Sequence, residues 1–181
     1  GRTNDARSIA IQGVQVNARD AGSYILNARL CEREGKWTDV FAWSEVVYSL
    51  DPRNTDACLL SAKALLRLGR PSVAAARCQW LVSQKPASTA LIEAQLIQAE
   101  AEMVLGDASA ALGVLSRTRP VTSVQLEVYT ALNATALCRL GRSDEALRIA
   151  QDTPSNGAGI AALLAIGRES ADDVANTAIR E

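Results

Sequence analysis

Four glycines recur along the middle of the chain at nearly constant spacing. They lie at positions 35, 69, 106 and 141, so successive glycines are 34, 37 and 35 residues apart. Each glycine closes a run whose apolar residues recur at helical spacing, and glycine readily adopts the left-handed backbone that ends a helix. A second run begins a few residues later. The spacing predicts successive helix-turn-helix units with a period near 35 residues.

Prolines mark the other end of each unit. We expect the second helices over residues 38–50, 71–84, 107–117 and 143–152, and a proline, which cannot continue a helix, follows each of them. Pro71 instead occupies a first helical turn, where proline is tolerated. Thr122 and Gln125 form a capping box that predicts a new helix start after Pro120. The four boundary prolines are Pro52, Pro86, Pro120 and Pro154.

This pattern resembles the tetratricopeptide repeat, a 34-residue helix-turn-helix unit with small residues at two fixed positions and proline near its end. The units would cover residues 21–54, 55–88, 89–121 and 122–153. Val40 departs from the pattern because it replaces one small residue. The resemblance implies an all-α fold, a right-handed α-α superhelix or solenoid of stacked hairpins. The matching small residues are Ala28, Ala62, Ala74, Ala99, Ala111, Ala134 and Ala146.

The two ends of the chain are expected to cap this stack, as terminal repeats do. Residues 1–20 predict one capping helix over about 5–18, although Gly13 inside it costs roughly 1 kcal/mol relative to alanine. Residues 154–181 predict a degenerate helix pair over 160–166 and 172–179. The sequence therefore predicts an N-terminal cap, four repeats and a C-terminal cap.

Composition agrees with closely packed helices. Aromatic residues make up only 4% of the chain and alanine is abundant, which favours an all-α fold over a sheet. The cysteines form no CxxC pair, and the chain has no histidine, so we expect no metal site and no cofactor. Buried reduced thiols favour a reducing compartment such as the cytoplasm. The cysteines are Cys31, Cys58, Cys78 and Cys138, the last at a position that can face a groove.

Catalysis and two classes of partner are disfavoured. Without histidine, the usual general base and the dyads built on it are excluded, and no phosphate-binding loop or nucleophile elbow occurs, so we expect no enzyme activity. A net charge of −1 disfavours nucleic-acid binding, which needs a cationic surface. No apolar run reaches the ~20 residues of a membrane span, so we expect no direct membrane insertion.

The resemblance also implies where a ligand would bind, because the first helices of such repeats line a concave groove. Arg29 and Arg33, like Lys63 and Arg67, are like-charge pairs four residues apart on one helix. One explanation is an acidic peptide segment or terminal carboxylate as ligand. The alternative is a solvated face neutralised by neighbouring acids such as Glu32 and Asp56. The other predicted groove residues are Leu59, Leu66, Leu96, Glu100, Met103 and Arg139.

The apolar members of this set have two interpretations: they grip a peptide, or they pack between first helices. From the whole pattern we expect a non-enzymatic scaffold or adaptor that binds a protein segment in its groove. Two alternatives stay open: the repeat domain of a larger enzyme or membrane-associated complex, and a secretion-type chaperone. The sequence does not indicate the partner's identity or the oligomeric state.

Overall fold

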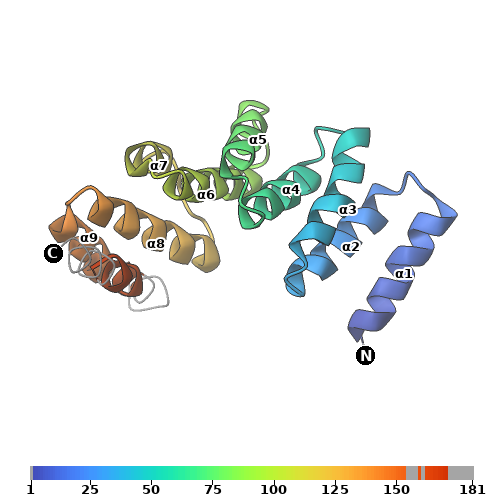
Figure 1. Ribbon diagram of the computed structural model, residues 1–181, viewed down its shortest axis with the longest axis horizontal. Helices are drawn as coiled ribbons and strands as arrows, with labels where there is room; N and C mark the ends of the chain where they lie inside the picture. The colour runs from blue at the N-terminus through green and yellow to red at the C-terminus, as the bar shows by residue number, and fades with distance from the viewer. Residues whose placement is uncertain (1, 154–158, 160–161, 171–181) are drawn as a thin grey trace. The chain divides into compact units, whose positions relative to one another are not determined.

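The computed structural model describes residues 2–153, 159 and 162–170, and these residues form helices joined by short turns (Figure 1). Residues 162–170 are also helical. The prediction of an all-α helical repeat is confirmed for this part of the chain. The labelled helices are α1 (Arg2–Val16), α2 (Ala21–Arg33), α3 (Trp37–Leu50), α4 (Thr55–Arg67), α5 (Pro71–Ser83), α6 (Ser88–Val104), α7 (Ala108–Leu115), α8 (Ser123–Arg139) and α9 (Ser143–Asp152).

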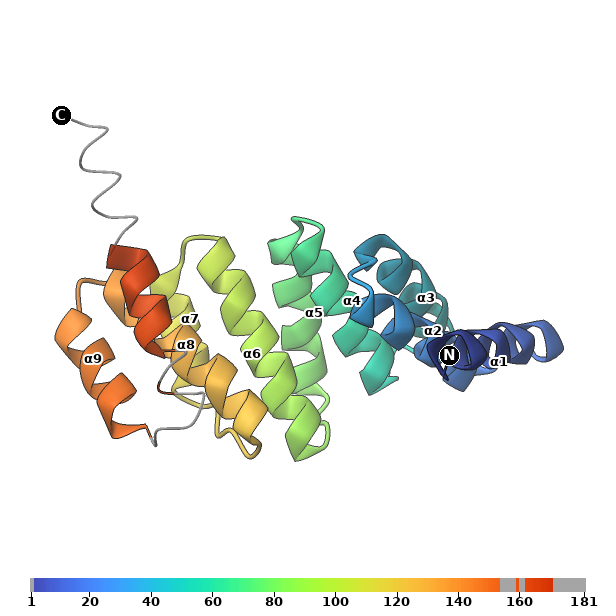
Figure 2. The same ribbon diagram turned by 90° about the horizontal axis from the view of Figure 1, so that it is seen from below.

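The chain divides into two compact units, Gly1–Ile97 and Gln98–Glu181, and the boundary falls inside α6. In the first unit, α2 packs against α3, α3 against α4, and α4 against α5. In the second unit, α7 and α9 each pack against α8. Figure 2 shows α8 and α9 as neighbours, with the helix of residues 162–170 beside them. Each unit is therefore built from consecutive helices that pack on their neighbours in the sequence.

The turn after α4 shows how each first helix ends. Gly69 has a φ of +74°, in the left-handed region. Its N–H donates to the carbonyl of Leu66 at 3.2 Å, and the next N–H, from Arg70, donates to the carbonyl of Leu65 at 2.9 Å. This pair of bonds satisfies carbonyls that the helix end leaves without partners. The same arrangement follows α2, α6 and α8 at Gly35, Gly106 and Gly141.

Replacing Gly69 with alanine is expected to lower the free energy of unfolding by roughly 1–2 kcal/mol, the cost of a left-handed backbone for a residue with a Cβ. An added Cβ would meet no atom within 4 Å, so backbone strain is the only cost. Gly113 is the matched control, because its Cβ would also be in open space but it lies inside α7. Gly113→Ala should stabilise by about 0.5–1 kcal/mol. Urea unfolding measures both, and equal effects would contradict this account of the turn.

The small residues of the repeat are fully buried. The seven alanines that match the repeat pattern are 0% exposed, and Val40, which departs from it, is also 0% exposed. The repeat therefore accommodates one larger side chain at a position that is small elsewhere. Around these contacts, Leu65 of α4, Leu81 of α5 and Leu115 of α7 are each 1% exposed and fill the spaces between helices.

The N-terminal helix α1 packs against α2, as expected of a cap, but it runs over Arg2–Val16 rather than 5–18. Gly13 has a packing reason that the sequence did not show. A Cβ at this position would collide with the hydroxyl oxygen of Ser23 in α2. Asp20 caps α2 by accepting hydrogen bonds from the N–H groups of Gly22 and Ser23. The interior glycine therefore permits a close approach of two helices.

The C-terminal end agrees in part with the prediction. A helix is present over residues 162–170, extending past the predicted end at 166, and its Ala162 and Ile166 pack against Leu137 of α8 and Ala146 of α9. The predicted helix over 172–179 and the boundary proline Pro154 lie outside the described residues. The second helix α7 is only 8 residues long, which agrees with an early stop before Pro120.

Candidate functional site

The predicted basic groove of the first unit is crossed by ion pairs. Arg29 of α2 contacts Asp56 of α4, with Nη2 and Oδ1 3.0 Å apart. Lys63 of α4 contacts Glu32 of α2 at 3.2 Å and Glu93 of α6 at 2.6 Å. Glu32 and Asp56 are the acids that the sequence suggested as neutralising neighbours. Two of the four predicted basic residues are therefore compensated by carboxylates on adjacent first helices.

Lys63 is the most strongly held of these cations. Burial of its ammonium lowers the pKa, but the hydrogen bonds and charges of Glu93 and Glu32 outweigh burial and raise the pKa of Lys63 above its ordinary value. The ammonium group is therefore protonated at neutral pH and shared between two carboxylates. It contributes to holding α2, α4 and α6 together more than it offers charge to a ligand.

Arg33 and Arg67 lie in the last turns of α2 and α4, one helical turn beyond Arg29 and Lys63, and both are exposed; the Arg29 side chain is exposed as well. The negative end of the helix dipole stabilises a cation in the last turn. Arg33 and Arg67 therefore each stabilise the helix that they end. The guanidinium of Arg67 also lies over the ring of Trp37, 5.9 Å from its centroid. Together with Arg29, whose side chain is 56% exposed, these two arginines place accessible guanidinium groups on the predicted groove.

The apolar side chains predicted to line the groove are buried. Leu59 is 5% exposed and Leu66 is 7% exposed, and Leu96 and Met103 are equally inaccessible at 6% and 5%. The structure therefore favours the second interpretation of these four residues, packing between helices, over direct contact with a ligand. Glu100 of α6 is half-buried. The predicted set thus separates into buried apolar residues and charged residues that are exposed or half-buried.

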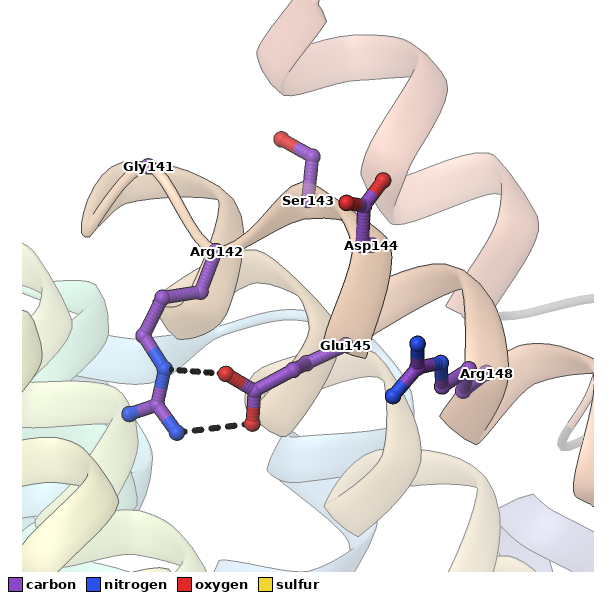
Figure 3. Close-up of a pocket in the computed structure, with 6 residues that line it drawn as sticks. All are labelled: Gly141, Arg142, Ser143, Asp144, Glu145 and Arg148. Atoms are coloured by element: carbon purple, nitrogen blue, oxygen red, sulfur yellow. Dashed lines mark hydrogen bonds and ion pairs between the residues drawn. The ribbon is translucent and has the colours of Figure 1, made fainter.

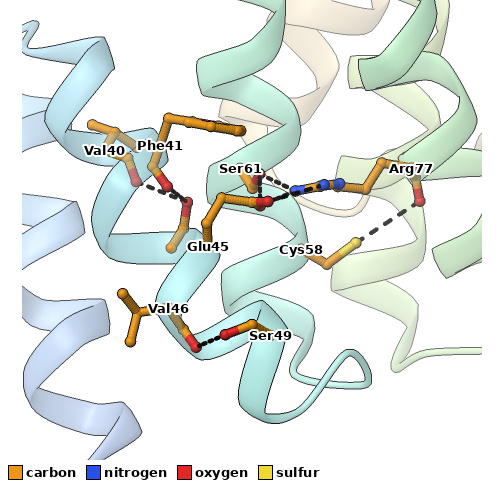
Figure 4. A network of polar contacts seen from close by, with 9 residues as sticks. Val40, Phe41, Glu45, Val46, Ser49, Cys58, Ser61 and Arg77 are labelled. Atoms are coloured by element: carbon orange, nitrogen blue, oxygen red, sulfur yellow. Dashed lines mark hydrogen bonds and ion pairs between the residues drawn. The ribbon is translucent and has the colours of Figure 1, made fainter. Parts of the chain in front are cut away.

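A polar cluster between α3, α4 and α5 was missed by the sequence analysis (Figure 4). The hydroxyl of Ser61, which is 0% exposed, donates to a carboxylate oxygen of Glu45 at 2.7 Å. Arg77 pairs with the same carboxylate and donates to the Ser61 hydroxyl, and its guanidinium lies 4.2 Å from the ring centroid of Tyr48. The arginine side chain is only 13% exposed. The cluster therefore joins three consecutive helices through one largely buried charge pair.

The cysteines are placed as predicted for packing residues. Cys31, Cys58 and Cys78 are buried, and Cys138 is partly exposed beside the core of the second unit. Burial raises the pKa of Cys58 to about 11 and also raises those of Cys31 and Cys78. The Cys58 thiol donates to the carbonyl of Arg77 at 3.8 Å (Figure 4). These three thiols are protonated at neutral pH, so they are poor nucleophiles.

In the second unit, Arg139 joins three segments. Its guanidinium donates to both carboxylate oxygens of Glu169, each at 3.0 Å, and to the carbonyl of Met103 at 2.9 Å. Met103 lies in the last turn of α6, and its carbonyl also accepts a hydrogen bond from the N–H of Gly106 at 3.2 Å. Arg139 therefore contacts the C-terminal end of α6 and holds the helix of residues 162–170 against α8.

Two hollows in the second unit differ in character. One, about 410 Å³, lies between α8 and the helix of residues 162–170, where Ala131, Leu132 and Thr135 face Leu164, Ala165, Arg168 and Glu169. Ala131 and Thr135 occupy the same repeat positions as Leu96 and Glu100, two of the predicted groove residues 35 residues earlier. This hollow is the described feature that best matches the predicted binding groove in position and apolar lining.

The other hollow, about 430 Å³, lies at the start of α9 (Figure 3). Figure 3 shows Arg142 and Glu145 pointing toward each other, and the guanidinium donates two hydrogen bonds of 2.7 Å to the carboxylate. The bond from Arg142 lowers the pKa of Glu145. The Glu145 carboxylate therefore compensates Arg142, and Asp144 and Arg148 line the hollow beside this pair.

Sites of other kinds were sought among the same residues. In the described ranges, no group of three or more Cys, Asp or Glu side chains gathers in a way that could hold a metal ion. Of the helices described, none combines the length and apolar character that crossing a membrane requires.

No protein-family model matches the sequence, and no curated protein matches it either. Among solved structures, one similar chain belongs to a complex described as "Structure of Naa15/Naa10 bound to HypK-THB". The two chains share 13% sequence identity and superpose with a TM-score of 0.35. The similarity covers 98% of this chain and 35% of that one, so this chain spans about a third of its neighbour's length.

Proposed function

We propose that the chain is a non-enzymatic protein-interaction scaffold of the tetratricopeptide kind, which binds a segment of a partner protein on the exposed side of its first helices. The observation that carries the proposal is the repeated hairpin with its glycine-terminated first helix, found after α2, α4, α6 and α8. Stacked hairpins of this kind create extended surfaces to which each unit contributes side chains.

The accessible charge of the first unit indicates the chemistry of one such segment. Arg33 and Arg67 end successive first helices, α2 and α4, which contact each other directly. Arginine forks match carboxylates in geometry and charge. The proposed ligand of this surface is an acidic peptide segment held by these two arginines, while Arg29 and Lys63 maintain the ion pairs between the helices.

Two alternatives suggested by the sequence are compatible with this proposal. A repeat domain within a larger enzyme or membrane-associated complex, or a secretion-type chaperone, would use the same surface for the same chemistry. The absence of histidine from the sequence supports a binding role for this segment over a catalytic one.

A fluorescent peptide of alternating glutamate and leucine residues provides a direct test, with the lysine-leucine peptide as its charge-reversed control. The acidic peptide is expected to bind more tightly, and Arg33→Ala with Arg67→Ala is expected to weaken its binding about tenfold or more, because two charge-assisted contacts are lost. Arg53→Ala, an exposed arginine in the turn before α4, should change nothing. Equal binding of both peptides, or no effect of the double variant, would remove the acidic-segment proposal.

A further inference from the structure

A row of apolar side chains on α8 is exposed. Val124 is 67% exposed and Val128 is 41% exposed. Further along the helix, Ala131, Leu132 and Thr135 line the hollow of about 410 Å³. At about 100° per residue, all five positions fall within an arc of roughly 100°, so they share one helix face. We refer to these five residues as the α8 stripe.

The helix of residues 162–170 forms the far wall of the hollow at one end of the stripe. Ala162 and Ile166 pack this helix against the core of the second unit. Leu164 lines the hollow, and its side chain is 59% exposed. An exposed leucine opposite Leu132 gives two apolar walls. A hollow of this size has room for a large apolar side chain from a partner.

The rim of the hollow carries a positive charge. The carboxylate of Glu169 accepts two hydrogen bonds of 3.0 Å from the guanidinium of Arg139. Arg168, next to it, also lines the hollow and is exposed, and no ion pair to it is found among the residues that the structure describes. A carboxylate on a partner is the group that would complement this guanidinium.

The dimensions of the α8 stripe match a short helix. From Val124 to Thr135 the stripe extends about 16 Å at 1.5 Å per residue, which is about three helical turns. Apolar side chains spaced along one face, with a deeper hollow at one end, are what an amphipathic helix uses when it binds in a groove. An extended acidic segment would gain little from this surface, because Arg168 is the one basic side chain lining the described hollow.

We propose that the α8 stripe and the hollow beside it bind an amphipathic helix of a partner protein, with a large apolar side chain in the hollow and a carboxylate facing Arg168. This inference rests on the proposed scaffold function and adds a second, chemically different binding surface to it. In this account the second unit binds apolar side chains of a partner, whereas the first unit binds carboxylates through its arginines.

The test uses the full chain and a phage-displayed library of 16-residue helical peptides, with leucine or phenylalanine on one face and random residues beside it. Selection is expected to enrich aspartate or glutamate near one end of the peptide. Binding of a selected peptide should fall at least tenfold in Val124→Asp and in Val128→Asp. Both side chains are exposed, so thermal unfolding should change little. Val73→Asp, exposed on α5, is the matched control.

Charge reversal gives the sharpest result. Selection against the Arg168→Glu chain is expected to enrich lysine or arginine where aspartate or glutamate appeared before. The inference is overturned if no peptide is enriched, if binding is unaffected by both stripe variants, or if the charge preference is the same in Arg168→Glu. If it fails while the glutamate-leucine peptide still requires Arg33 and Arg67, the scaffold proposal stands without the α8 site.

Discussion

Replacing Leu65 with alanine is expected to lower the free energy of unfolding by about 3 kcal/mol. Leu65 is 1% exposed in α4, the helix that packs against both α3 and α5. Truncating a buried leucine removes its transfer free energy and leaves a cavity, which together cost about 2–5 kcal/mol. Urea unfolding followed by circular dichroism at 222 nm measures the change.

Leu68 is the matched control for this prediction. It lies three residues further along, just past the end of α4, and is 40% exposed. Leu68→Ala should therefore cost less than about 1 kcal/mol. A similar loss of stability in both variants would contradict the placement of Leu65 in the interior between the hairpins.

Replacing Glu45 with alanine is expected to destabilise the protein by about 2–4 kcal/mol. The substitution leaves the guanidinium of Arg77, only 13% exposed, without its carboxylate and leaves the buried hydroxyl of Ser61 without its acceptor. Removing one partner of a buried charge pair costs about 3–5 kcal/mol. The lower end applies here because the Glu45 side chain is 32% exposed and water screens it in part.

A double variant separates lost packing from an unpaired charge. Glu45→Leu combined with Arg77→Met removes both charges and keeps apolar volume, so its stability should return to within about 1 kcal/mol of the parent. Arg77→Met alone should be less harmful than Glu45→Ala, because the carboxylate left behind is more accessible to water. If the double variant is as unstable as Glu45→Ala alone, the charge pair is not the cause of the loss.

The repeat plan could be predicted from the sequence because it depends on local backbone rules. Glycine after a helix, proline beyond the next one and the Thr122 capping box each act over a few residues, and the structure confirms the left-handed glycines and the capping box. Helix ends shifted by a few residues, as for α1. Such shifts are expected because helix ends depend on caps and packing together.

The candidate site was less predictable because it depends on contacts between helices. Lys63 was predicted to offer charge to a ligand, but Glu93, 30 residues away, contacts it. The Glu45 to Arg77 pair spans 32 residues and has no local signal. Their positions on successive second helices could have suggested that they are neighbours. Whether Leu59 faces outward or inward is a matter of a small helix rotation, which apolar spacing alone does not determine.

The central claim of this account is that partners contact the first helices of the hairpins. Nuclear magnetic resonance shift mapping tests it most directly: the isotope-labelled chain is titrated with the glutamate-leucine peptide and with a library-selected helical peptide. The account predicts shifts at Arg33 and Arg67 for the first peptide and at Val128 for the second, with second-helix residues such as Val73 and Leu147 unchanged. Shifts centred on the second helices, or none for either peptide, would contradict it.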